Sequence, residues 1–298
     1  MRIPIFTDDA GWQGAQLKQA FAKRGVEAVF VSLQECVIDL SKLQPLIHIP
    51  HFESLPPAAF VRGVAGGTFQ QVITRLNVLH MLTRQGVRIY NQTQAIERTV
   101  DKAMTSFLLR MHGVATPATW VCESRAQAEL VRRNAAQSNR QLVLKPLFGS
   151  QGQGVRKLLS HESLPVPMQQ YVDGVYYLQE FIETAHKPHD YRVFVIGGKV
   201  VAAMKRLGES WVNNVASGGR CEAVVPDERM TTLALNAALA VNIDYCGVDI
   251  IQAATGDYYV LEVNSIPAWR GLQSVTDFNI AELLVDDFLA KLAAINMV

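Results

Sequence analysis

The stretch Gly247-Val248-Asp249-Ile250-Ile251, followed by Val260-Leu261-Glu262-Val263-Asn264, decides how we interpret the fold of this chain. Both segments are rich in apolar and β-branched residues, and Thr255-Gly256 lies between them as a turn signal. The pattern therefore predicts a β-hairpin. If the strands pair symmetrically about this turn, Asp249 faces Glu262. The opposite face, which we expect to belong to the core, then carries Val248, Ile250, Leu261 and Val263.

The opposed carboxylates predict a metal site. Like charges that face each other across a hairpin repel, so the pair needs a cation or a shared proton. Asn264 adds an amide oxygen on the face of Glu262. Such hard oxygen ligands suit Mg²⁺, which takes further ligands from phosphates and water. An acid/base dyad and a solvated polar face are the alternative interpretations.

Composition limits the classes of protein that fit. The 298 residues are 49% hydrophobic and 18% charged, and the net charge is +1. This is a globular composition of roughly two domains, without a basic field for nucleic acid. No apolar run has the length of a signal peptide or a membrane span, so we expect a cytoplasmic protein. The four cysteines are scattered and are expected to be free thiols.

Residues 1–97 alternate between strand and helix patterns. Apolar strands are predicted at 3–6, 26–33, 46–49 and 87–90, and residues 69–85 carry a helical apolar stripe. This rhythm predicts a small parallel sheet with helices on its faces.

A glycine-rich loop follows a strand that ends at Lys145. Gly149, Gly152 and Gly154 lie between two predicted strands, with Ser150 inside the loop. Glycines let a backbone wrap closely around phosphates, and a lysine is a common phosphate ligand. A P-loop or a dinucleotide fingerprint would need a helix after the glycines. A flexible connection is the alternative.

A second hairpin is predicted around Gly197-Gly198. Symmetric pairing of residues 191–196 with 199–205 would place Asp190 opposite Lys205, with Arg192 on the same face. This arrangement is either a polar wall for nucleotide and substrate or a solvated ion pair.

The order of the motifs resembles the ATP-grasp superfamily and its RimK-like glutamate-ligase branch. The motifs are Asn91, Asp101-Lys102, 143–146 with the glycine loop, 178–182, 190–192, 200–206, Asn213-Asn214 with Gly218-Gly219, 247–250, and 261–264 with Pro267. The resemblance implies an α/β fold, α+β in its C-terminal two-thirds. It divides the chain into a Rossmann-like pre-ATP-grasp domain at 1–97, a small lobe with the glycine loop at 98–183, and a C-terminal lobe with the metal hairpin at 184–298.

The resemblance also implies roles for individual residues. Arg192, Arg206 and Lys145 would be catalytic. Asp249, Glu262 and Asn264 would hold Mg²⁺, as two ions, with Mn²⁺ as a substitute. The ATP site would comprise Lys102, Lys145, Gly149, Ser150, Gly152, Gly154, Gln179, Glu180, Phe181, Ile182, Asp190, Lys205 and Asn214. Backbone groups of 180–182 would contact adenine, and Asp190 would contact the ribose. Alternatively, Gln179 and Glu180 are polar residues of an edge strand.

The implied reaction is amide formation. ATP would convert a carboxylate into an acyl phosphate, and an amine would displace the phosphate. L-glutamate is the favoured amino acid, and its partner would be a pterin or deazaflavin coenzyme, a peptide or a protein tail. A phosphotransferase and a non-catalytic nucleotide-binding regulator are the alternatives. The acceptor, the number of residues added, the α or γ linkage, the oligomeric state and the roles of Trp269 and Arg270 stay open.

Overall fold

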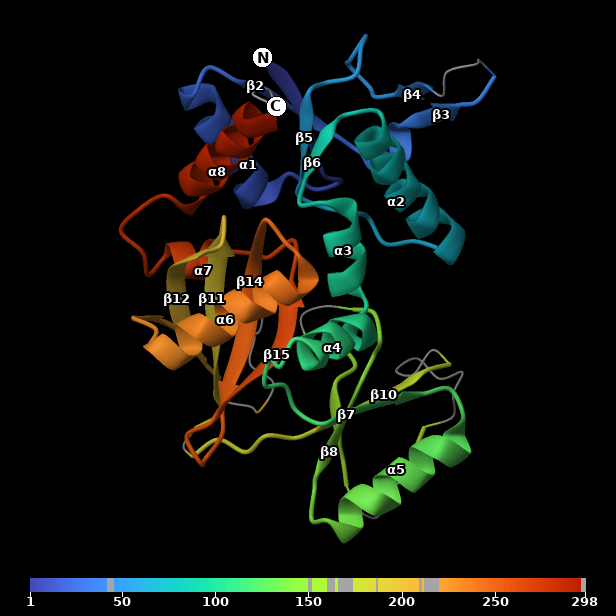
Figure 1. Cartoon of the computed structure of the whole chain (residues 1–298), viewed down its shortest axis with the longest axis vertical. Coiled ribbons are helices and arrows are strands. Elements are labelled where there is room, and N and C mark those ends of the chain that lie inside the picture. Colours follow the sequence, from blue (N-terminus) through green and yellow to red (C-terminus); the bar gives the residue numbers. More distant parts are fainter. Residues whose placement is uncertain are drawn as a thin grey trace. The chain divides into compact units, whose positions relative to one another are not determined.

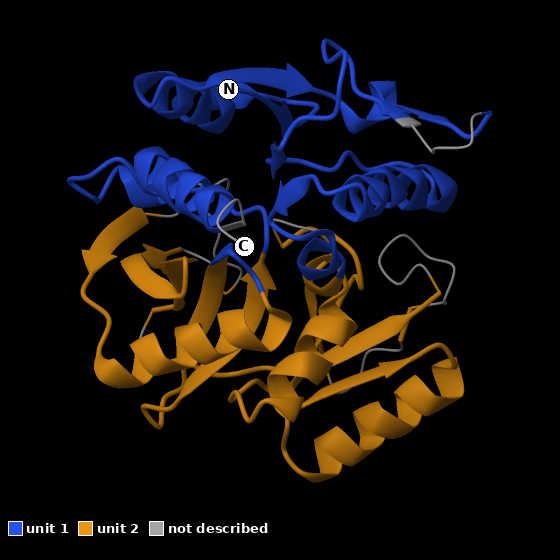
Figure 2. Cartoon of the chain, turned by 45° about the horizontal axis from the view of Figure 1, so that its top comes forward, with its two compact units in different colours: residues 1–97, 243–246, 265–298 blue, residues 98–242, 247–264 orange. Residues whose placement is uncertain are grey.

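The computed structural model describes residues 1–41, 46–149, 152–159, 164–165, 174–185, 187–208, 211 and 220–295. The chain divides into two compact units, coloured blue and orange in Figure 2. Unit 1 comprises residues 1–97, 243–246 and 265–298, and unit 2 comprises residues 98–242 and 247–264. The three-part division expected from the sequence remains a prediction. Residues 265–298, which that division gives to the C-terminal lobe, belong to unit 1.

Unit 1 contains a parallel sheet, as predicted, in the order β2-β1-β5-β6 (Figure 1). The strand predicted at 46–49 is not part of this sheet, because β4 pairs antiparallel with β3, and the sequence did not predict β5. Its strands are β1 (Arg2–Phe6), β2 (Glu27–Val31), β5 (Ala58–Val61) and β6 (Arg88–Tyr90), with a separate pair β3 (Val37–Asp39) and β4 (Leu46–His48). Its helices are α1 (Gly11–Lys23), the 3-10 helix η1 (Leu33–Glu35), α2 (Phe69–Arg84), α7 (Arg270–Gln273) and α8 (Ile280–Ile295). Helix α3 (Thr93–Val100) begins in this unit.

The C-terminal helix α8 packs against α1, and ion pairs reinforce the contact. Lys23 Nζ lies 2.7 Å from Glu282 Oε1, and Arg24 Nη2 donates to Asp286 Oδ2 at 2.7 Å. Phe288 of α8 packs edge-on against Phe21 of α1, with ring centroids 5.3 Å apart. Both ends of the sequence thus contribute to one core.

Unit 2 contains two antiparallel sheets. The first has the order β7-β10-β8-β9, and α5 covers the face that carries Leu142, Leu144 and Leu178. The second has the order β13-β12-β11-β14-β15, and α6 packs on it. The bounds are α4 (Lys102–Met111), β7 (Thr119–Cys122), α5 (Arg125–Gln137), β8 (Leu142–Lys145), β9 (Arg156–Leu158), β10 (Tyr176–Glu180), β11 (His189–Ile196), β12 (Lys199–Leu207), β13 (Arg220–Val224), α6 (Glu228–Val241), β14 (Tyr245–Gln252) and β15 (Tyr258–Asn264).

The hairpin of β14 and β15 has the predicted pairing at the end away from its turn, where Asp249 and Glu262 lie. Asp249 pairs with Glu262, and Gly247 pairs with Asn264. Nearer the turn the register is shifted by one residue, because a bulge after Asp249 leaves Leu261 without a counterpart. Ile250 therefore pairs with Val260, which is buried in place of the partly exposed Leu261. The expectation that Leu261 belongs to the core is wrong for this reason.

The second hairpin departs from its predicted pairing. Next to the Gly197-Gly198 turn, Ile196 pairs with Lys199 as expected, but a bulge at Phe194/Val195 shifts the pairing beyond it. Asp190 consequently pairs with Arg206, and Lys205 pairs with Tyr191. The predicted pairing of Asp190 with Lys205 is wrong.

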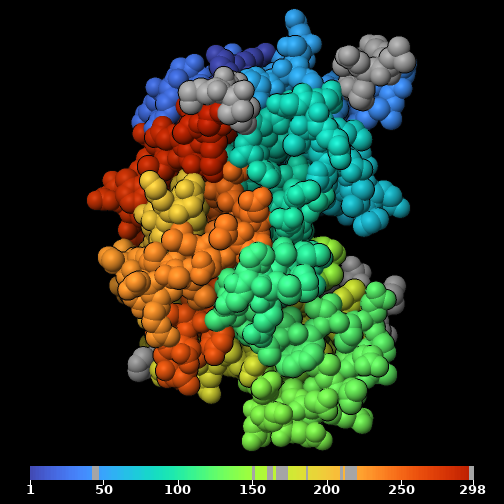
Figure 3. All heavy atoms as spheres, in the orientation of Figure 1, coloured from blue at the N-terminus to red at the C-terminus, as the bar shows by residue number. Residues whose placement is uncertain are grey.

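Helix α4 lies at the surface of unit 2 (Figure 3), and exposed apolar side chains follow one of its faces. Met104, Phe107 and Met111 are 44%, 58% and 67% exposed, at spacings that place them on one helix face. Such a stripe is a candidate contact surface for a homo-oligomer, which the sequence leaves open. None of the helices in the described part of the chain combines the length and apolar character needed to cross a bilayer.

Candidate active site

Asp249 lies in a buried network of two acidic and two basic side chains. Arg192 donates to both Asp249 oxygens, with Nη2 2.9 Å from Oδ2. Arg206 Nη2 lies 3.1 Å from the same Oδ2, while Arg206 also binds both oxygens of Asp190 at 2.6 and 2.7 Å. Burial raises the pKa of Asp249, but the two guanidiniums outweigh it and hold that pKa below its usual value. Asp249 is therefore a carboxylate at neutral pH.

The expected contact of Asp190 with a ribose gains no support from this network. Both Asp190 oxygens accept hydrogen bonds from Arg206. Burial keeps the pKa of Asp190 above its usual value, although Arg206 opposes the shift. Asp190 instead holds the Arg206 guanidinium against Asp249, so the role that the structure supports is one of positioning.

Glu262 has a different environment from the carboxylate that it faces. Among the described residues it makes no hydrogen bond or ion pair. The Glu262 charge favours the protonated form of two lysines from other elements, Lys102 at the start of α4 and Lys145 at the end of β8. Burial outweighs this effect at both lysines. It lowers the pKa of Lys102 below its usual value and that of Lys145 to about 8.

Two arginines and two lysines near the opposed carboxylates change the prediction that was based on their repulsion. The sequence suggested that opposed Asp249 and Glu262 need a metal ion or a shared proton. In the structure Arg192 and Arg206 neutralise Asp249, and Lys102 and Lys145 act on Glu262. Repulsion between the two carboxylates therefore does not by itself require a metal.

The donor set nevertheless fits Mg²⁺. Glu262 makes no hydrogen bond to a described residue, and Asn264 has a buried amide nitrogen that likewise lacks a partner there. Asp249 Oδ1 accepts from Arg192 alone and retains a second lone pair, whereas Oδ2 faces both arginines. No group of three His, Cys, Asp or Glu side chains that could hold a metal lies within the described ranges. The site would therefore depend on two carboxylates and the Asn264 amide oxygen, the ligand type that Mg²⁺ prefers.

Lys145 is held by a polar network on the face of its sheet opposite α5. Its Nζ donates to Gln179 Oε1 at 2.6 Å, and Gln179 Nε2 donates to Thr119 Oγ1 and to the Tyr177 hydroxyl at 3.1 and 3.2 Å. Gln179 is 1% exposed and its strand β10 is internal, so the alternative that it is an edge-strand polar residue is wrong. Ser106 of α4 extends the network, with its Oγ 2.7 Å from the Tyr177 hydroxyl.

The predicted hinge at 180–182 has part of its backbone already bonded. The Glu180 N–H donates to Ala118 O and the Phe181 N–H donates to Gln141 O, both at 2.8 Å. Ile182 makes no backbone hydrogen bond to any described residue outside regular strands and helices, so its N–H is the group of this segment that can donate to a base. The Phe181 ring lies 3.5 Å below Lys157 Nζ and packs edge-on against Trp211.

The glycine loop lies between β8 and β9, as predicted, and Lys102 contacts it. Lys102 Nζ donates to the Gly149 carbonyl at 2.8 Å and to the Leu147 carbonyl at 3.4 Å. Gly149, Gly152 and Gly154 have φ angles of 133°, 69° and 72°, a region that strongly favours glycine. Ser150 and Asn214 lie outside the described residues.

Lys205 lies on the opposite sheet face from Arg206. Its Nζ is 5.9 Å from the ring of Tyr191, which packs against Tyr258. The Tyr258 hydroxyl donates to Asp227, the N-cap of α6. The sheet face that carries Lys205, Tyr191 and Tyr258 is therefore the one that α6 covers. Arg206 occupies the position opposite Asp190 that we predicted for Lys205.

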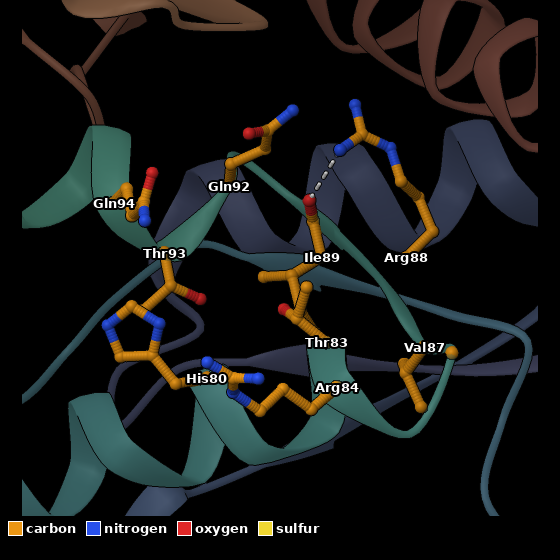
Figure 4. A pocket seen from close by; sticks show the side chains of 10 residues that line it. His80, Thr83, Arg84, Val87, Arg88, Ile89, Gln92, Thr93 and Gln94 are labelled. Atoms are coloured by element: carbon orange, nitrogen blue, oxygen red, sulfur yellow. Dashed lines mark hydrogen bonds between the residues drawn. The ribbon is translucent and has the colours of Figure 1, made fainter.

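A surface pocket of about 460 Å³ lies in unit 1, where α2 ends and β6 begins (Figure 4). His80, Arg84 and Arg88 line it, and Arg88 Nη1 donates to the Ile89 carbonyl at 3.3 Å. None of the predicted nucleotide or metal residues lines this pocket, so it is separate from the site described above.

Comparison with known proteins gives the class of enzyme. The RimK-like ATP-grasp domain family matches residues 99–288. The chain is 30% identical over 295 residues to the tetrahydromethanopterin:alpha-L-glutamate ligase of Methanococcus maripaludis, covering 97% of this chain and 98% of that protein. It is also 30% identical to a probable alpha-L-glutamate ligase of Vibrio vulnificus, covering 99% and 97%.

Solved structures show the same fold. ATP-grasp ligase PsnB, complexed with minimal precursor, Mg and ADP, has a TM-score of 0.72 at 22% identity, covering 98% of both chains. The D-cycloserine synthetase DcsG has a TM-score of 0.74 at 18% identity, covering 98% of this chain and 100% of that one. The fold is thus that of the ATP-grasp ligases. The chain belongs to the RimK-like ATP-grasp family, and it is an ATP-dependent ligase.

Proposed function

We propose that the protein joins the amine of L-glutamate to a carboxylate of its acceptor. The observation that carries the proposal is the opposition of Asp249 and Glu262, with Lys102 and Lys145 acting on the second carboxylate. Relatives that are about 30% identical along nearly the whole chain are alpha-L-glutamate ligases, which favours glutamate and an α linkage.

The reaction first activates the acceptor. A carboxylate oxygen of the acceptor attacks the γ-phosphorus of ATP, ADP leaves, and an acyl phosphate forms. The glutamate amine then attacks the acyl carbon, phosphate leaves with the bond electrons, and the nitrogen loses a proton. No side chain needs to act as a nucleophile, so catalysis depends on positioning and on fixed charge.

The residues of unit 2 have distinct proposed roles in this scheme. Lys102 and Lys145 hold phosphate oxygens, and the Ile182 N–H contacts adenine. Arg192 and Arg206 counter the charge of the transferred phosphoryl group while they orient Asp249. Asp249, Glu262 and Asn264 would hold Mg²⁺, which when bound neutralises phosphate charge. We propose two ions, for which Mn²⁺ can substitute.

A pterin coenzyme with a free carboxylate is the first acceptor to test, because the relatives include tetrahydromethanopterin ligases. Deazaflavin coenzymes, peptides and protein tails complete the panel. ADP release with ATP, Mg²⁺ and L-glutamate should require the acceptor, and the product should be heavier by one glutamyl residue. A phosphorylated product without glutamate would identify a phosphotransferase instead.

A further inference from the structure

The pocket at the end of α2 lies wholly within unit 1 and takes no part in the proposed ATP chemistry (Figure 4). All the residues that line it fall between positions 80 and 94, in the last turns of α2, in β6 and at the start of α3. Its volume of about 460 Å³ is in the range of sites that bind small molecules. The polar groups that face it therefore indicate what it could bind.

Strand β6 presents an open edge to the pocket. It is the last strand in the order of its sheet, with β5 on one side and no described strand on the other. The Arg88 N–H donates to the Pro57 carbonyl on the β5 side at 3.1 Å. Because N–H groups alternate along a strand, that of Ile89 points to the open edge, where it donates to no described residue. Ile89 is 1% exposed, so this is a buried donor that needs an acceptor.

The start of α3 adds unused donors to the same pocket. The N–H groups of Thr93 and Gln94 begin the helix, and neither donates to a described residue. Thr93 is 3% exposed, and its hydroxyl also lacks a partner within the described ranges. Figure 4 shows this hydroxyl directed between His80 and Ile89, toward the middle of the lining residues. Free N–H groups at a helix start favour an anion.

One basic side chain of the pocket has no acidic partner. His80 Nε2 lies 2.8 Å from Glu97 Oε1, and Arg88 Nη2 donates to Asp244 Oδ1 at 2.6 Å. Arg84, in the last turn of α2, forms neither an ion pair nor a side-chain hydrogen bond with the described part of the chain. The pocket thus has one cation whose charge no neighbouring acid compensates.

We propose that this pocket binds a small carboxylate through Arg84 and the donors at the start of α3, at a site separate from the nucleotide and metal residues. The planar fork of an arginine matches the two oxygens of a carboxylate. A single uncompensated cation, with the Glu97 carboxylate close by, favours a singly charged anion over a phosphate dianion. The amides of Gln92 and Gln94, which also line the pocket, suit a neutral polar body on the ligand.

The test is ligand-observed saturation-transfer NMR on the full chain saturated with Mg-ADP. The probe is N-acetylglycine, compared with its uncharged amide and with inorganic phosphate. Arg84→Met removes the cation, and Thr93→Val removes the hydroxyl at nearly constant shape. Arg110→Met is the matched control, because Arg110 is likewise an exposed arginine in the last turn of a helix, α4. Mg-ADP affinity and thermal unfolding are measured for each variant.

We expect the wild type to bind N-acetylglycine with a dissociation constant of about 0.1–10 mM, and its amide about tenfold more weakly. Arg84→Met should weaken binding of the acid by about tenfold and abolish the preference for it. Thr93→Val should weaken binding by about 3- to 10-fold without lowering the unfolding temperature, because the hydroxyl has no described partner to lose. Arg110→Met and all Mg-ADP affinities should match the wild type.

Three results would overturn the inference. The wild type could show no saturable binding of N-acetylglycine, or Arg84→Met could keep the wild-type affinity and preference for the acid. Phosphate could also bind more tightly than N-acetylglycine and lose that affinity in Arg84→Met, which would make the pocket a phosphate site. None of these results would affect the proposed ligase function, because the nucleotide and metal residues lie outside the pocket.

Discussion

The side chain of Asn91 forms hydrogen bonds with both backbone groups of Tyr245. Asn91 Oδ1 accepts from the Tyr245 N–H at 2.9 Å, and Nδ2 donates to the Tyr245 carbonyl at 2.8 Å. The same amide accepts from the Asp244 N–H at 3.0 Å and donates to the Ser265 carbonyl at 2.6 Å. Asn91 thus joins the residues that enter and leave the metal hairpin, and all its partners belong to unit 1.

Replacing Asn91 with aspartate should strongly destabilise the protein. The new oxygen would face the carbonyls of Tyr245 and Ser265, which need a donor, in a fully buried position. We expect the free energy of unfolding to fall by about 2–4 kcal/mol, measured by urea denaturation. The exposed neighbour is the control, because Gln92→Ala should change stability by less than about 0.5 kcal/mol. Equal urea midpoints for Asn91→Asp and wild type would contradict this role.

The two opposed carboxylates should respond differently to amide substitution. Asp249→Asn leaves Arg192 without a charged partner in a buried site and leaves Arg206 with Asp190 alone, so we expect a loss of about 2–4 kcal/mol of stability. Glu262→Gln breaks no hydrogen bond to a described residue, so stability should change by less than about 1 kcal/mol. Both variants should lower ATP turnover by at least about 100-fold if the carboxylates hold the metal.

Urea unfolding and ADP release, measured on the same preparations, check this contrast. Normal turnover by Glu262→Gln would remove Glu262 from the metal site. An equal stability loss in both variants would mean that Glu262 has structural partners beyond those described.

The sequence predicted the hairpins but could not predict their bulges. Alternating apolar residues and glycine turns identify strands locally, and the hairpin predicted around Thr255-Gly256 is present as β14 and β15. A bulge depends on packing against other strands, which no local pattern encodes. Asp249 still met Glu262 because the bulge shifts only the part of its hairpin nearer the turn. The bulge after Phe194 lies between the turn and Asp190, so that pairing changed.

Side-chain hydrogen bonds between segments that are far apart in the sequence could not be predicted from local patterns either. One such network joins three elements through Lys145, Gln179, Tyr177 and Ser106. No motif or spacing in the sequence pointed to Tyr177 or Ser106. Ser124-x-x-Gln127 has the sequence pattern of a capping box, but Ser124 makes no side-chain capping bond, whereas Thr68 and Gln71 do form a capping box at α2. The order of motifs located the lysines and carboxylates, but only the fold revealed which guanidinium binds which acid.

The corrected position of Lys205 gives a test with two lysines. Lys205→Ala should leave ADP affinity within about twofold of wild type, because Lys205 lies on the face covered by α6. Lys102→Ala should weaken ADP binding by about tenfold or more, because it removes a phosphate ligand near the glycine loop. Titration calorimetry with Mg-ADP compares the two variants directly. A stronger effect of Lys205→Ala would return Lys205 to the nucleotide site.

Lys145 should make nucleotide binding depend on pH in the alkaline range. Its pKa of about 8 means that the ammonium loses its proton as the pH rises from 7 to 9.5, whereas the phosphates of ADP are already ionised there. ADP affinity of the wild type should therefore fall above pH 8, by at most about tenfold per pH unit. Lys145→Arg keeps its charge over this range and should show a flat profile. A sloping profile in that variant would assign the titration to another group.

The lowered pKa of Lys145 should make the stability of the fold rise with pH, in the same range in which ADP affinity falls. The folded chain releases the Lys145 proton near pH 8, whereas the unfolded chain holds it up to about pH 10.5. Because the unfolded state binds more protons in this window, the contribution of Lys145 to stability rises with pH there and is lost as the pH falls through 8. Lys145→Met should therefore gain stability relative to wild type at pH 7, and the gain should shrink by pH 10. Urea denaturation at pH 7 and pH 10 measures this difference in the stability gain. A gain that is independent of pH would show that burial does not lower the pKa of Lys145.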